Sequence, residues 1–101
     1  MTFTLKSGTN KGNRRIWIEG DRLASVGLTR GTVLYRSIHN GTMILSTTPA
    51  DGRKHRIAGT ADRPILDLCG KWVTAFIGSA SHFTCAVVTD PDGLNLIITP
   101  C

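Results

Sequence analysis

The feature that most constrains this chain is an internal repeat. Residues 15–49, RIWIEGDRLASVGLTRGTVLYRSIHNGTMILSTTP, share a pattern with residues 63–100, RPILDLCGKWVTAFIGSASHFTCAVVTDPDGLNLIITP. Each segment opens with an arginine and a strand-like alternation, which leads through a glycine into a short amphipathic stretch. Two further strand-like runs follow, and both segments finish on Thr-Pro. We therefore divide the chain into two repeats, residues 1–50 and 51–101.

Periodicity and turn residues predict the elements of each repeat. Residues 16–19 (IWIE) alternate with the period of two that a strand with one buried face requires. Asp21 is the expected N-cap of a helix of about two turns that ends near Gly27. The Asn-Gly pair at 40–41 and the DPDG turn at 90–93 each predict a hairpin. With the arms TFTLK and KHRIAG in front, each repeat is predicted to run strand, strand, short helix, strand, strand.

A repeat of this size cannot bury its own apolar face. Its helix is far below the roughly 12–15 residues at which an isolated helix becomes marginal in water. Two repeats can bury their apolar faces by closing their sheets against each other into a small barrel without exposed edges. The expected fold is mainly β with short helices: two ββαββ units closed into one β-barrel with pseudo-two-fold symmetry. The hydrophobic content of 41% fits a single folded domain over residues 1–101.

The segment IWIEGDRLASVGLTRGTVL and the NGTMIL hairpin after it resemble the AbrB-like swapped-hairpin fold, and within it the SymE-like toxin branch. AbrB-like proteins usually build their barrel from two identical chains, so the resemblance implies a tandem fused pseudo-dimer here. It also implies DNA binding by a regulator, an antitoxin or a nucleoid-type protein. SymE-like members have been described as RNA-cleaving toxins. AbrB-type units usually carry basic residues in the short helix, whereas here only Arg22 is basic, which favours an asymmetric contact through the first repeat.

Positive charge is concentrated in the first part of the chain. Residues 1–63 hold 11 of the 12 lysines and arginines and four of the seven acids, a net charge of +7. Residues 64–101 hold one lysine and three acids, a net charge of −2. A polyanionic partner is the usual reason for such a one-sided surplus, and a merely solvated surface is the alternative.

Two basic stretches and one helical arginine are the predicted phosphate contacts. The glycine-containing loop SGTNKGN allows close approach of backbone to a phosphate, and GRKHR at 52–56 is the densest basic run. A solvated loop and a hydrophilic linker are the respective alternatives, and two adjacent arginines at 14–15 cannot both face outward on one strand. The predicted nucleic-acid-binding residues are Lys11, Arg14, Arg15, Arg22, Arg53, Lys54 and Arg56.

The aromatic residues do not predict a stacking platform. Trp72 and Phe76 lie four residues apart on the second predicted helix, which is the spacing of a core-facing pair. Trp17 is out of phase with its isoleucine neighbours, so it either covers the end of the barrel or lies at a partner surface.

The sequence contains no motif that predicts catalysis, a metal site or a cofactor. The three cysteines, Cys69, Cys85 and Cys101, are widely spaced and are interpreted as free thiols of a reducing compartment. No run of about 18 apolar residues is present, and the first 15 residues lack the apolar core of a signal peptide. A cytoplasmic protein without a membrane partner is therefore expected.

Three functions follow as hypotheses. The leading one is sequence-tolerant DNA binding of the AbrB/SymE-like type by a monomeric pseudo-dimer, with a homodimer as the alternative state. The second is a small phage-type inhibitor or adaptor that binds a nucleic-acid-handling protein. The third is a SymE-like RNA-directed toxin.

Overall fold

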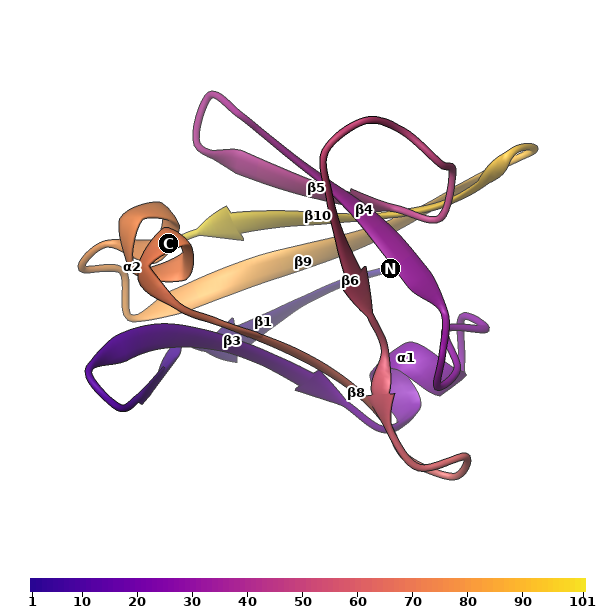
Figure 1. Cartoon of the computed structure of the whole chain (residues 1–101), viewed down its shortest axis with the longest axis horizontal. Helices are drawn as coiled ribbons and strands as arrows, with labels where there is room; N and C mark the ends of the chain where they lie inside the picture. The colour runs from indigo at the N-terminus through magenta and orange to yellow at the C-terminus, as the bar shows by residue number, and fades with distance from the viewer.

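A computed structural model describes residues 1–101 as ten strands and two short helices (Figure 1). The order of three strands, a helix and two strands occurs first in residues 2–46 and again in residues 53–100. The elements of the first half are β1 (Thr2–Lys6), β2 (Gly8–Asn10), β3 (Asn13–Glu19), α1 (Asp21–Ala24), β4 (Val33–His39) and β5 (Thr42–Ser46). Those of the second half are β6 (Arg53–Arg56), β7 (Ala58–Gly59), β8 (Pro64–Cys69), α2 (Lys71–Ile77), β9 (His82–Asp90) and β10 (Gly93–Pro100).

The strands form two antiparallel sheets that lie face to face (Figure 1). The larger sheet has the order β1-β9-β10-β5-β4-β6, and the smaller has the order β2-β3-β8-β7. Replacing each strand by its counterpart in the other half gives the same two orders read backwards. The topology therefore has a two-fold relation between the halves.

Each half lends its first strand to the other. β1 pairs with β9, and β6 pairs with β4, so the outer strand of each half extends the hairpin of the opposite half. The centre of the larger sheet is the pairing of Leu45 with Leu96, and the centre of the smaller is that of Trp17 with Asp67. Neither half contains a complete sheet of its own.

The core lies between the sheets and is wholly apolar. Eighteen buried hydrophobic residues form one cluster, and no polar or charged residue is buried. The alternating residues of β3 and β8 supply its floor, and both helices pack against these two strands. α1 contributes Leu23, while α2 contributes Val73 and Ile77. The short helices are thus stable because they cover a core that both halves build together. Neither helix is long or apolar enough to cross a membrane.

The prediction of a mainly β fold with short helices is confirmed, but the predicted closed barrel is wrong. The larger sheet ends at β1 and β6, and the smaller ends at β2 and β7. The reason lies at Ser7 and Ile57, the single residues at which the chain leaves one sheet and enters the other. There the continuing chain connects the sheets, and no ladder of hydrogen bonds runs between them. The hydrogen bonds at these residues extend the larger sheet: the Ser7 amide donates to Ser81 O, just before β9, and the Ile57 amide donates to Thr32 O, just before β4.

These bends also divide the first arm of each half, so three strands precede each helix where two were expected. The start of α1 differs as well. Gly20, with φ of 72°, precedes the helix without a side-chain cap, and Asp21 is the first helical residue. A positive φ favours glycine, which explains why the helix begins directly after it.

We predict that the free energy of unfolding depends strongly on the centre of the larger sheet. Leu45→Ala removes a fully buried side chain that lies opposite Leu96, and it should lower the free energy of unfolding by about 2–5 kcal/mol. Ile44→Ala is the matched control, because the neighbouring side chain points to the other face and is only half-buried. Urea unfolding followed by tryptophan fluorescence measures both, and equal losses would contradict the assigned faces of β5.

Candidate nucleic-acid interface

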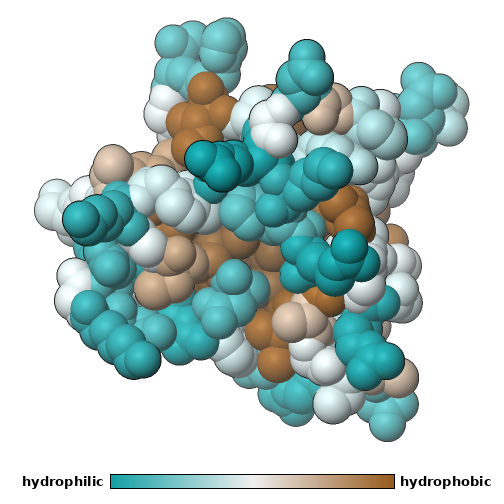
Figure 2. Space-filling view, in the orientation of Figure 1, coloured by the Kyte–Doolittle hydropathy of each residue, from teal (hydrophilic) through white to brown (hydrophobic).

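Four unpaired cations gather on two neighbouring strands at one edge of the larger sheet. We call Arg36 of β4 together with Arg53, Lys54 and Arg56 of β6 the basic cluster. The face of the molecule on which β6 lies is mostly hydrophilic, with apolar groups visible between the hydrophilic ones (Figure 1 and Figure 2). None of the four has a carboxylate oxygen within 4.0 Å, since the ion pairs of the structure join Arg15 to Asp67 and Arg63 to Glu19.

The register of β4 and β6 divides the basic cluster between two faces of the sheet. Arg53 lies opposite Arg36, and His55 lies opposite the buried Leu34. Because directly paired residues share a face, these side chains lie on the inner side, toward the smaller sheet. Lys54 and Arg56 alternate with them and lie on the outer side, opposite Tyr35 and Val33 respectively.

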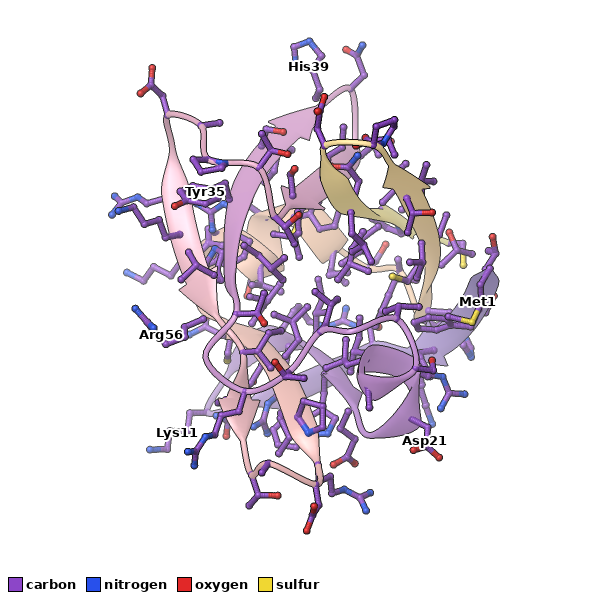
Figure 3. All side chains as sticks on the ribbon, turned by 90° about the vertical axis from the view of Figure 1, so that its right-hand side faces the viewer. Met1, Lys11, Asp21, Tyr35, His39 and Arg56 are labelled. Atoms are coloured by element: carbon purple, nitrogen blue, oxygen red, sulfur yellow. The ribbon has the colours of Figure 1, made fainter.

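On the outer side, the charged groups are accessible and lie beside an aromatic ring. Lys54 and Arg56 are exposed, and the Lys54 ammonium is 6.0 Å from the centroid of the half-buried Tyr35 ring. Tyr35 and Arg56 lie on one side of the molecule, whereas Met1 and Asp21 lie on the opposite side (Figure 3).

On the inner side, three flat groups pack together. The guanidinium carbon of Arg36 is 3.7 Å from the centroid of the Trp72 ring at the start of α2. The His55 ring stacks on the same indole, with 5.2 Å between centroids and an interplanar angle of 26°. Arg36 Nη1 and His55 Nε2 are 3.2 Å apart. A guanidinium can only donate, so Nε2 accepts this hydrogen bond and His55 is neutral with its proton on Nδ1.

Burial and neighbouring charge both act on these groups. Burial lowers the pKa of His55, and the positive charge of Arg36 lowers it further. Burial likewise lowers the pKa of Arg36, with a smaller contribution from Arg53. The inner side therefore holds one partly desolvated guanidinium, that of Arg36, without a compensating anion.

The opposite edge of the sheet shows uncharged residues at the positions equivalent to those of the inner side. There Leu5 pairs with the buried Phe83, as His55 pairs with Leu34, and Phe3 pairs with Cys85, as Arg53 pairs with Arg36. The correspondence is set by the two bends, because Leu5 lies two residues before the bend at Ser7 and His55 lies two residues before the bend at Ile57. Thr4 and Lys6 correspond to Lys54 and Arg56, so β1 carries one cation where β6 carries three. The fold does not require a basic edge.

The predicted loop residues are distributed over different environments. Lys11 is exposed in the turn between β2 and β3, on the same side of the molecule as Arg56 (Figure 3). Arg14 instead uses its guanidinium internally, donating to the carbonyl oxygens of Gly8, Gly78 and Ala80 and to the hydroxyl of Ser7. It ties the loop after α2 to the smaller sheet.

Arg15 and Arg22 also lie apart from the basic cluster. Arg15 makes a two-pronged ion pair with Asp67, with N–O distances of 2.8 and 2.9 Å, and lies 4.3 Å from the centroid of Trp17. Arg22 is exposed, with its guanidinium carbon 5.2 Å from the centroid of Phe3, at the β1 edge opposite β6. The structure thus brings together Arg53, Lys54 and Arg56 of the predicted set.

Sequence reasoning did not include Arg36, Tyr35 or Trp72 in the site. Trp72 and Phe76 were expected in the core, but both are half-buried, and Val73 and Ile77 are the core residues of α2. The alternation of Val33, Tyr35 and Ser37 with Leu34 and Arg36 could have placed Arg36 on the inner face, where an arginine is unusual.

No group of three or more His, Cys, Asp and Glu side chains is arranged to hold a metal ion. All three cysteines are free, and burial raises the pKa of the Cys85 thiol to about 12, which leaves it unreactive near neutral pH. No protein-family model, curated protein or solved structure matches this chain.

We predict that acidification destabilises the fold through His55. Because its pKa is lower in the folded state than the usual 6.5, the unfolded chain binds more protons as the pH falls below that value. The free energy of unfolding should therefore be highest above about pH 7 and should fall between pH 6.5 and 5. His55→Gln should remove much of this fall.

Urea unfolding at pH 7.5 and 5.5 tests this expectation, with the exposed His82 as the control position. His82→Gln should behave as the wild type does. An equal pH dependence in His55→Gln and the wild type would show that neither burial nor the charge of Arg36 lowers the pKa of His55 in the folded protein.

Proposed function

We propose that this protein binds DNA through phosphate contacts made by the basic cluster. The observation that carries the proposal is the gathering of Arg36, Arg53, Lys54 and Arg56 on one edge with no carboxylate within 4.0 Å of any of them. Unpaired cations of this density repel one another, and the phosphates of a nucleic acid would relieve that repulsion while releasing counterions.

The outer side of the basic cluster suits a duplex backbone. Lys54 and Arg56 are exposed, and they point outward from the same face of β6. Arg56 Nη1 donates to the Gly31 carbonyl oxygen at 3.4 Å, which leaves its other donors for a phosphate. Lys11 lies on the same side of the molecule and would extend the contact beyond the sheet edge (Figure 3). Contacts of this kind neutralise the backbone without reading bases, so the binding would tolerate many sequences.

The class of DNA-binding protein that we propose is AbrB-like, with the SymE-like branch as the nearest resemblance. The exchange of β1 and β6 between the halves supports this assignment, because a swapped-hairpin dimer fused into one chain would also exchange strands between its halves. A regulator, an antitoxin and a nucleoid-type protein are all compatible with the basic edge, and an RNA-directed toxin is the alternative within the same branch.

One observation favours the second candidate, a protein that inhibits a nucleic-acid-handling machine. β6 is an edge strand, so one side of its backbone can pair with a strand from a partner protein. A partner that survives nuclease treatment in a pull-down, and that is lost on replacing residues of β6 by proline, would support this candidate over DNA binding.

We predict that the salt dependence of DNA binding locates the contact. For the wild type, log K should fall steeply with log salt concentration, and Lys54→Gln combined with Arg56→Gln should reduce the slope by about 2. Fluorescence anisotropy with a labelled duplex at about 50–200 mM salt measures these slopes. Lys6→Gln is the matched control, because Lys6 occupies on β1 the position that Arg56 occupies on β6.

The control separates a local contact from a general effect of net charge. If Lys6→Gln and Arg56→Gln lower the affinity equally, the two edges contribute alike and the basic cluster is not the binding site. If the wild type binds no duplex at about 50 mM salt and micromolar protein, the proposed function fails altogether.

A further inference from the structure

The inner side of the basic cluster contains two opposed arginines that the fold does not explain. Arg36 and Arg53 are direct cross-strand partners, and directly opposed like charges destabilise a sheet. Arg36 is half-buried, while Arg53 is exposed at the sheet edge. Neither guanidinium has a carboxylate within 4.0 Å. The pair therefore leaves positive charge unneutralised in a hollow where solvent screens it only in part.

The equivalent pair of the other half shows that this position accepts uncharged residues. Phe3 and Cys85 face each other there, and Cys85 is fully buried in the core. The guanidinium carbon of Arg22 lies 5.2 Å from the centroid of Phe3, whereas the Trp72 ring on the other edge lies 3.7 Å from the guanidinium carbon of Arg36. The two edges thus share one backbone arrangement, and only one of them has a cation at both positions of this cross-strand pair.

We propose that Arg36 and Arg53 hold one phosphate group of a single-stranded nucleic acid, whose unpaired base stacks against the neighbouring aromatic groups. Planar guanidinium forks bind phosphate oxygens in pairs, and two of them facing one hollow can enclose a phosphate from both sides. This inference rests on the proposed function and adds the form of nucleic acid that the inner side accepts.

Two features favour a single strand over a duplex. First, the hollow is lined by Arg36, Arg53, Lys54, His55 and Trp72, so phosphate-binding and stacking groups meet in one place. Stacking of bases on aromatic rings and arginine planes requires bases that are free of a partner strand. Second, Arg36, Arg53 and His55 lie on the inner side of the sheet, whereas a rigid duplex meets the exposed outer residues first. A flexible strand can pass over the edge from Lys54 into the hollow.

The residue pair at the β1 edge suggests a test variant for the arginine pair. Arg36→Cys combined with Arg53→Phe installs the pair that the other half carries at the same positions, so it should fold at least as stably as the wild type. We expect the affinity of this variant for a labelled 12-nucleotide single strand to be lower than that of the wild type by roughly 10-fold or more, because the variant lacks two charged donors. Its affinity for a hairpin duplex should fall less, because Lys54 and Arg56 remain. Fluorescence anisotropy measures both affinities, and thermal unfolding verifies the fold.

The outcomes separate this inference from the proposed function. Loss of single-strand binding with duplex binding largely retained supports it. Equal losses for both probes, or unchanged single-strand affinity in a folded variant, overturn it and leave DNA binding through the outer residues standing. If the wild type binds neither probe, the proposed function and this inference both fail.

Trp72 provides a second readout. The chain has two tryptophans, and in a Trp17→Phe background the fluorescence reports Trp72 alone. We expect the single strand to quench this fluorescence and the hairpin duplex to leave it nearly unchanged. In the same background, Trp72→Leu should weaken single-strand binding roughly 5-fold or more, as loss of one stacked base does. No quenching by a strand that binds would overturn the stacking part of the inference.

Discussion

The exchange of outer strands between the halves is the interaction on which the rest of this structure depends. β1 hydrogen-bonds only to β9, and β6 only to β4, so each half completes the larger sheet of the other. Because the exchanged strands bend at Ser7 and Ile57 and continue into the smaller sheet, they also hold the two sheets face to face. The apolar core between the sheets, and the helices that cover it, exist only when both halves are present.

This arrangement explains why the two edges of the sheet can differ so much in chemistry. The core needs Leu34 and Phe83 in equivalent places, and both are fully buried. The residues beside them on the same face are less constrained, and they diverge into an arginine pair with a histidine on one edge and into apolar side chains on the other. The charge imbalance along the sequence thus becomes a local difference between two edges with the same backbone.

How far the sequence predicted the structure depends on the range of the interactions. The strand at 16–19 and the turn at 40–41 follow from period and from glycine, which are local properties, and both were predicted. The pairing of Arg53 with Arg36 and the internal hydrogen bonds of Arg14 could not be predicted, because they depend on the register between segments distant in sequence. The run at 53–56 was recognised as basic, but its division between two faces follows only from the partner strand.

Carrying both halves in one polypeptide has a consequence for how a binding surface can arise. In a symmetric pair of identical chains, every substitution occurs twice, so an arginine at position 53 would add its repulsion of the opposed arginine on both sides at once. Here position 3 keeps a phenylalanine while position 53 has an arginine. The β6 edge can therefore acquire binding residues that lower the stability of the fold, while the β1 edge keeps residues that maintain it.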